Sequence, residues 1–145
     1  GLSKDYDAKL GFGTVILEEE NGFETALGLN RHLSIPSLEK EGFFLSVAGD
    51  LAIAKAGLIL AVGFDPMMVL ERQFLLDDDK VFFLSLGLGL AATMVDQSGE
   101  ANTTDVGIIA GLTGGLDFNE DWRGLLELSL RDDAKRLGIG AATHF

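Results

Sequence analysis

The sequence predicts an all-β fold: a closed antiparallel up-and-down β-barrel of eight strands that is transmembrane. Three observations support this prediction. Apolar residues recur at every second position over most of the chain, which is the period of a β-strand rather than of a helix. The opposite face of each alternating stretch carries mostly glycine, alanine and serine. Charged residues concentrate in the short segments between these stretches.

The composition limits the kinds of protein to consider. With 145 residues we expect one β-barrel domain, 1–145. The formal net charge of −12 argues against nucleic acid as a partner, because little in the chain would neutralise phosphates. The chain has no cysteine, which excludes thiolate metal sites, disulfides and cysteine nucleophiles. Residues 1–7 lack the pattern of a signal peptide, as they would in a mature chain from which one has been removed.

The first half of the chain supplies three alternating strands and one less regular segment. The strand at 9–17 ends in an acidic turn with Asn-Gly, a strong hairpin signal, and 23–31 forms the second strand. A polar connection covers 31–42, and the third strand covers 43–54.

Residues 58–76 also alternate, but Pro66 interrupts them. We expect one long strand with a bulge at Asp65 and Pro66, since proline occurs in sheets at edges or bulges. Two separate strands, or a short helix at 66–70, are the alternatives.

The second half of the chain alternates most clearly. Residues 81–95 carry leucine on one face and small residues on the other. A tilted barrel strand needs only about 9–11 residues to cross a membrane, so this segment is long enough. A polar loop at 96–105 leads to strands at 106–118, 123–131 and 137–145. The total is eight, and an up-and-down barrel needs an even number to close.

The two faces indicate which side is outside. A soluble lipocalin-like barrel would carry well-hydrated residues outside, whereas here the non-apolar face is small. A narrow eight-stranded lumen leaves room only for small side chains and a few paired charges, so we expect the leucine-rich face to meet lipid. Charged residues within the strands mostly fall on the small-residue face, with Arg72 as an exception; those on that face are Glu24, Asp50, Asp65, Glu71, Asp117, Arg123, Glu127 and Arg131.

These charges predict a polar network in the lumen. A turn at 119–121 can set Asp117 opposite Arg123, and Arg123 beside His144 across the final hairpin. Pairing acids with bases is how a narrow barrel tolerates buried charge. We expect a network that plugs or narrows the barrel, formed by Glu24, Asp50, Asp117, Arg123, Glu127, Arg131 and His144.

Aromatic residues gather at the ends of the expected strands. Phe43, Phe82, Phe118 and Trp122, together with Phe145, fall at one rim, as in the aromatic girdle of a membrane interface. Ordinary packing at strand ends is the alternative, and one tryptophan and one tyrosine are few for a girdle.

Two segments carry a resemblance to a known family. Residues 114–123, a strand followed by a tight turn and a tryptophan, resemble the last periplasmic turn of small outer-membrane β-barrels of the OmpA/OmpX/OmpW type. The last nine residues resemble their C-terminal assembly signal, here Leu137, Ile139 and Phe145. The resemblance implies a mature outer-membrane protein whose partners are the lipid bilayer, the barrel-assembly machinery and other envelope proteins. Low tyrosine content and short loops depart from the family pattern.

Candidate catalytic and metal residues are few. The expected register places Ser129 near Leu137 or Gly138 and away from His144, so we expect no hydrolase and no enzyme. The acidic turn at 77–79 lacks the spacing of a calcium loop, and no metal or cofactor is predicted. The expected function is a structural or interaction barrel, or a narrow pore. A transport barrel for small apolar molecules and a soluble lipid-binding barrel are the alternatives.

Overall fold

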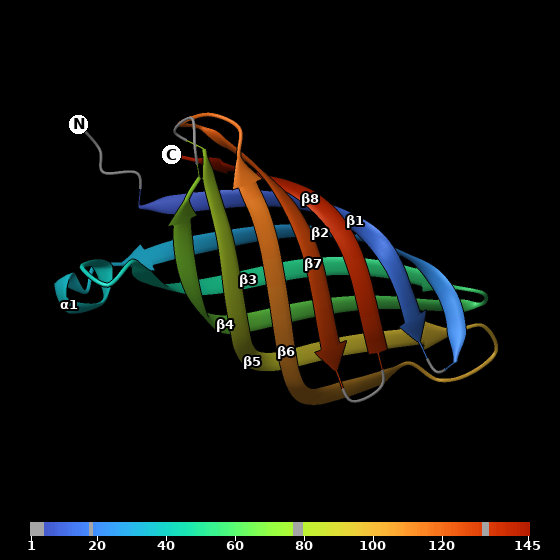
Figure 1. Ribbon diagram of the computed structural model, residues 1–145. Helices are drawn as coiled ribbons and strands as arrows, with labels where there is room; N and C mark the ends of the chain where they lie inside the picture. The colour runs from blue at the N-terminus through green and yellow to red at the C-terminus, as the bar shows by residue number, and fades with distance from the viewer. Residues whose placement is uncertain (1–4, 18, 77–79, 132–133) are drawn as a thin grey trace.

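The computed structural model describes residues 5–17, 19–76, 80–131 and 134–145. Eight antiparallel strands follow one another around a closed barrel in chain order (Figure 1). The expected acidic turn at 77–79 and the acidic pair at 132–133 lie outside the described residues. The elements are β1 Tyr6–Leu17, β2 Glu20–Leu33, α1 Pro36–Glu39, β3 Phe43–Ala56, β4 Ile59–Leu75, β5 Val81–Gln97, β6 Thr103–Asp117, β7 Trp122–Arg131 and β8 Ala134–His144.

Closure is made by the first and last strands. β1 pairs along its length with β2 on one side and with β8 on the other. The eight-stranded barrel predicted from the sequence is therefore confirmed. Most strands are longer than predicted, and β8 begins at Ala134 rather than at residue 137. The strand pairing continues through charged residues near the strand ends: Arg136 is buried in the lumen, whereas Asp96 and Asp105 are exposed.

The barrel has two distinct ends. The terminal end carries Tyr6, Phe145 and the β2–β3, β4–β5 and β6–β7 connections, and Figure 1 shows α1 at this end. The hairpin end carries the other four connections. The polar connection expected at 31–42 is shorter than predicted, because β2 continues to Leu33, and it contains the four-residue helix α1 with Pro36 in its first turn. The β5–β6 loop is likewise shorter than the predicted 96–105.

The predicted bulge in β4 is wrong. Gly49 pairs with Pro66 and Asp50 with Asp65 on one side, and on the other side Phe64 pairs with Ala92 and Met67 with Gly89, without an inserted residue. The two alternatives, a break into two strands and a helix at 66–70, are also wrong, since β4 is continuous. A side chain at Gly89 would collide with the Pro66 carbonyl and the Met67 backbone. The missing side chain, rather than a bulge, accommodates the proline in the strand.

We predict that Gly89→Ala lowers the free energy of unfolding by about 1–3 kcal/mol, because the added methyl group forces the two strands apart. Urea unfolding from lipid vesicles measures the change. Gly87→Ala is the matched control on the same strand, because a Cβ there meets side-chain atoms only at 3.4 Å or beyond. Equal losses in the two variants would contradict the role given to the Gly89 backbone contact.

The apolar face of the barrel points outward. Phe64, Leu88 and Ile139 have 52%, 56% and 66% of their surface exposed, and they belong to a large set of exposed leucine, isoleucine, valine and phenylalanine residues on all eight strands. The soluble lipid-binding alternative is wrong, because it requires this face to enclose the ligand. No helix in the described part of the chain is long and apolar enough to cross a membrane.

Ten of the buried apolar residues inside the barrel form two clusters. A cluster near the terminal end consists of Phe83, Leu125 and Ala142. The second cluster, called here the apolar seal, lies at the hairpin end and consists of Val15, Leu17, Ala54, Ala56, Ile59, Ala61 and Ala134. Charged side chains occupy the space between and beside these clusters.

Candidate functional site

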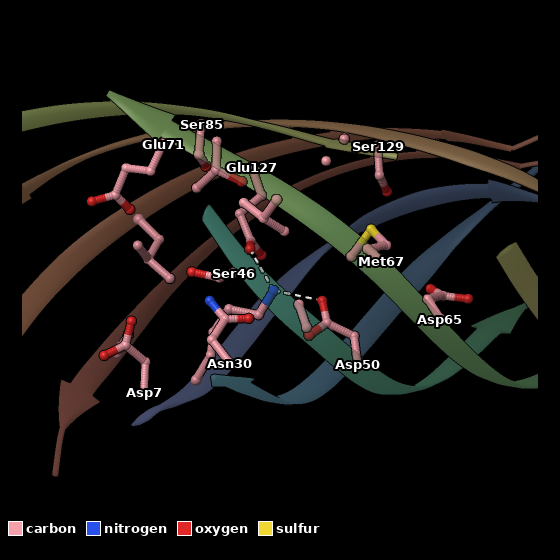
Figure 2. Close-up of a pocket in the computed structure, with 18 of the residues that line it drawn as sticks. Asp7, Asn30, Ser46, Asp50, Asp65, Met67, Glu71, Ser85, Glu127 and Ser129 are labelled. Atoms are coloured by element: carbon pink, nitrogen blue, oxygen red, sulfur yellow. Dashed lines mark hydrogen bonds and ion pairs between the residues drawn. The ribbon is translucent and has the colours of Figure 1, made fainter. Parts of the chain in front are cut away.

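The middle of the lumen is crossed by a chain of ion pairs. Lys9 Nζ lies 2.5 Å from Asp50 Oδ2 and 2.7 Å from Glu127 Oε1, so it links β1 to β3 and β7. Arg136 Nη2 donates to Glu127 Oε2 at 2.9 Å, and its Nε lies 2.8 Å from Glu24 Oε1 without an aligned hydrogen bond. Figure 2 shows both Lys9 contacts as dashed lines between Glu127 and Asp50. The network therefore joins strands on opposite sides of the barrel.

Arg123 organises a second group toward the terminal end. Its Nη1 donates to Glu71 Oε2 at 2.9 Å, and its Nε donates to Asp117 Oδ1 at 3.0 Å. The guanidinium carbon lies 4.1 Å from the centre of the Phe83 ring, within cation–π range. Gln73 donates to the other oxygen of Glu71 at 2.8 Å. The arginine is 5% exposed, so its charge is balanced by two carboxylates in place of water.

Arg131 makes a third contact toward the hairpin end. It pairs with Asp65, which is fully buried. Beyond this pair the lumen contains the apolar seal. Apolar side chains therefore replace charged ones in the lumen at the hairpin end.

The fourth group lies at the rim of the terminal end. His144 Nδ1 contacts Asp7 Oδ1, and His32 Nε2 lies 2.9 Å from Asp7 Oδ2. Ser46 Oγ lies 2.9 Å from His32 Nδ1. Asp7 and Ser46 are buried, and both histidines are partly exposed. The carboxylate of Asp7 therefore receives both histidines at once.

The space left between these groups is small. A cavity of about 80 Å³ is lined by residues that include Asp7, Asp50, Asp65 and Ser129, and Figure 2 shows Asp7 and Asp65 toward opposite ends of it. A cavity of this size holds only a few water molecules. The second carboxylate oxygens of Asp50 and Asp65 have no partner among the described residues, so water is their natural partner.

The structure places the seven residues of the predicted network as follows. Six make side-chain ion pairs in the lumen and His144 lies at the rim; the six are Glu24, Asp50, Asp117, Arg123, Glu127 and Arg131. Asp117 stands opposite Arg123 as predicted. The expected neighbour relation between Arg123 and His144 is wrong, because Arg123 pairs with Ala142 and the His144 side chain turns to Asp7. The strands are displaced by two residues from the predicted register.

Several members of these groups were not predicted. Lys9 begins the first predicted strand, Arg136 precedes the last one, and His32 falls in the predicted connection at 31–42. The alternation of β2 carries the signal for His32, since it continues the face of Glu24 and Asn30. The alternation predicts that Asp65 and Glu71 face the lumen, but the predicted network does not include them. Asp7 had no signal, because it lies before the first predicted strand.

The residues of the predicted girdle lie at the terminal end. Phe118 and Trp122 are 73% and 50% exposed, while Phe43 and Phe82 are half-buried at the starts of β3 and β5. Arg72, the outward-facing exception, lies with its guanidinium carbon 4.8 Å from the centre of the Phe43 ring. Contact with the rings and proximity to the rim explain how the exterior accepts this charge.

Phe145 is attached to the first strand. Its backbone N–H donates to the Tyr6 carbonyl at 2.9 Å, and the two rings stack with centres 6.0 Å apart. Leu137 and Ile139 of the predicted assembly signal are more than half exposed on the outer face of β8. All three residues of the signal therefore present apolar surface on the outside.

The arrangement of the serine and histidine residues gives little support for a serine hydrolase site. Ser129 pairs with Arg136 across the final hairpin, one residue from Leu137 and two from Gly138, its two predicted neighbours, and lies far along β7 from His144. Ser46, His32 and Asp7 are the residue types of a hydrolase triad, and they are in contact. Ser46 is 3% exposed within the lumen, so an ester of a bilayer lipid has no path to its hydroxyl.

Solved structures share this fold. The Neisserial surface protein A is 14% identical, with a TM-score of 0.66 over 100% of this chain and 99% of that one. The outer membrane enzyme PagL is 16% identical, with a TM-score of 0.61 over 94% and 97%. Ail, the attachment invasion locus protein of Yersinia pestis, is 12% identical, with a TM-score of 0.53 over 99% and 100%. No protein-family model and no curated protein sequence matches the chain.

The strand topology and the apolar outer face lead to the same conclusion about the type of barrel. A closed eight-stranded antiparallel meander, an apolar outer face and an ionic lumen are the features that small outer-membrane barrels need. By fold, this chain is a small eight-stranded transmembrane β-barrel of the outer-membrane type.

Proposed function

We propose that this chain is an integral outer-membrane barrel with a structural or interaction role, and that its lumen is closed. The observation that carries the proposal is the chain of contacts from Asp50 through Lys9 and Glu127 to Arg136, which crosses the barrel interior. The apolar seal supports the same conclusion from the hairpin end, because a hydrated path for ions would have to pass through it.

The two transport alternatives fit the lumen less well. A narrow pore needs a continuous aqueous path, whereas the cavity of about 80 Å³ holds only a few waters. A route for small apolar molecules needs an apolar interior, but the ion pairs of the described residues bring seven carboxylates and four lysine or arginine cations into this lumen. An apolar solute would have to displace these pairs at a large cost.

The resemblance also suggests an orientation and partners. The turn at 118–121 resembles a periplasmic turn of small outer-membrane barrels, so the terminal end with α1 would face the periplasm. The short connections of the hairpin end offer little surface for specific adhesion. We therefore place contacts with other envelope proteins at the terminal end, and we assign no catalytic role to the chain.

Conductance in planar lipid bilayers tests this proposal. The folded protein should insert without producing stepwise ion currents. Glu127→Ala combined with Arg136→Ala should also give no stepwise currents, because the apolar seal still closes the hairpin end after both side chains have left the middle of the lumen. A stable unit conductance of the unaltered protein would replace the proposal by the narrow-pore alternative.

The assembly signal leads to a separate prediction. We expect Phe145→Ala to reduce the yield of barrel assembled in cells more than it reduces the stability of barrel already folded, because the barrel-assembly machinery would read this exposed ring. Heat-modifiable migration on gels measures the yield, and urea unfolding measures stability. Phe118→Ala is the matched control, since it is an exposed phenylalanine at the same end but outside the last strand. Equal yields for the two variants would contradict the signal.

A further inference from the structure

The only two histidines of the sequence meet at one buried carboxylate. Asp7 on β1 is 2% exposed; His144 on β8 stands directly opposite it, and His32 lies on β2, the other neighbour of β1. One donor atom from each of the three side chains lies within 4.8 Å of the others. Closure of the barrel brings the three strands side by side although the residues are far apart in sequence.

We propose that Asp7, His32 and His144 form a binding site for a divalent transition-metal cation, with Zn²⁺ as its best-fitting member. Two imidazoles and one carboxylate are a ligand set that zinc accepts, with a water molecule in the fourth position. Imidazole ligands also favour the borderline metals over magnesium and calcium, which prefer oxygen-only sites. Metal–ligand distances of about 2.0–2.2 Å require small rotations of side chains already gathered around one point.

The hydrogen bond between His32 and Ser46 supports the site independently. A histidine that binds metal through one nitrogen generally donates its other N–H to an oxygen acceptor, which fixes the tautomer. His32 directs Nε2 toward Asp7, and its Nδ1 lies 2.9 Å from the Ser46 hydroxyl. When Nδ1–H donates to Ser46 Oγ, the lone pair of Nε2 points at the cation.

Charge balance gives a third argument. Among the lumenal ion-paired groups nearest the site, Asp7, Glu71 and Asp117 supply three negative charges, and Arg123 supplies one positive charge. With both histidines neutral, a divalent cation compensates the remaining two. The imidazoles are also reachable, since the side chains of His32 and His144 are 27% and 16% exposed at the terminal end. Two protonated histidines would balance the same charge, and the experiment must separate that state from metal binding.

Zn²⁺ titration of the full chain, folded in detergent and free of any histidine tag, tests the site. Calorimetry should show one Zn²⁺ per chain. His32→Gln or His144→Gln should weaken binding by more than about 100-fold, and Ser46→Ala by about 10–100-fold, as for loss of a supporting hydrogen bond. Asp105→Asn, which removes an exposed charge at the hairpin end, is the control for net charge and should leave the affinity unchanged. Binding that survives in the double histidine variant would overturn the proposal.

A second measurement avoids any dependence on the folding of variants. Nitrogen NMR of the unaltered protein reports directly on its two imidazoles. We expect both to shift from their free values on addition of one equivalent of Zn²⁺ and to return after a chelator is added. Imidazoles that stay unchanged in excess Zn²⁺ would show that the cluster holds protonated histidines and would overturn the site.

Discussion

Glu127→Ala should destabilise the barrel more than any other single substitution considered, by about 3–5 kcal/mol. Glu127 is 6% exposed and accepts contacts from Lys9 through one oxygen and from Arg136 through the other. Removing it leaves two cations in a lumen that water can scarcely enter, each with only one remaining carboxylate. Urea unfolding in lipid vesicles measures the loss, and the single tryptophan, Trp122, provides the fluorescence signal.

Two comparisons make this result specific. Glu100→Ala removes the same side chain from an exposed loop, and its effect should stay within about 0.5 kcal/mol. A double-mutant cycle of Glu127→Ala with Arg136→Ala should give a coupling of about 0.5–3 kcal/mol, because the two side chains share a contact. Strictly additive losses would mean that the pair does not contribute to stability as proposed.

Leu88→Arg should lower the free energy of unfolding from lipid by about 2–4 kcal/mol. Leu88 lies near the middle of β5, is 56% exposed and faces outward. In a bilayer this position lies near the midplane, where a guanidinium must reach water by distorting the lipid. In water the same substitution would be almost neutral, so the size of the effect reports what surrounds the barrel.

Leu75→Arg is the matched control for the depth of the substituted position in the bilayer. Leu75 is 77% exposed and ends β4 at the terminal end, where the interface lies, and the same substitution there should cost about 0–1 kcal/mol. If the two arginine variants unfold at the same urea concentration, the apolar face does not lie in a bilayer at the depth that the strand positions imply.

The alternation of side chains made the fold predictable. Leu86 and Leu88 face outward, and Ser85 and Gly87 face inward, as their spacing requires, because a β-strand has no other way to separate its faces. The even number of strands and the outward apolar face followed from the same pattern. The alternation could not show how Pro66 fits into β4, since the fit depends on the absence of a side chain at Gly89 on the next strand.

Which lumenal residues contact one another was harder to predict than which residues face the lumen. Lys9 and Glu127 are 118 residues apart in sequence, and their contact depends on how far the strands are staggered around the closed barrel. Hairpin geometry fixed Asp117 against Arg123, which are neighbours across one turn. It could not fix Asp7 against His144, because that contact needs the closing β1–β8 pair. The contact between Asp7 and His32 lies across the first hairpin, but both residues fall outside the predicted strands.

A spin-label scan along β5 tests the orientation of the two faces most directly. The chain has no cysteine, so single cysteines at 84, 86, 88 and 90, with Ser85→Cys and Ala91→Cys as inward positions, can each be labelled alone. In lipid vesicles, labels at the four outward positions should collide strongly with oxygen dissolved in the lipid and weakly with a water-soluble nickel complex. The two inward positions should show low collision with both reagents. High nickel accessibility at position 88, or the absence of any alternation, would contradict a barrel that faces lipid and encloses its charges.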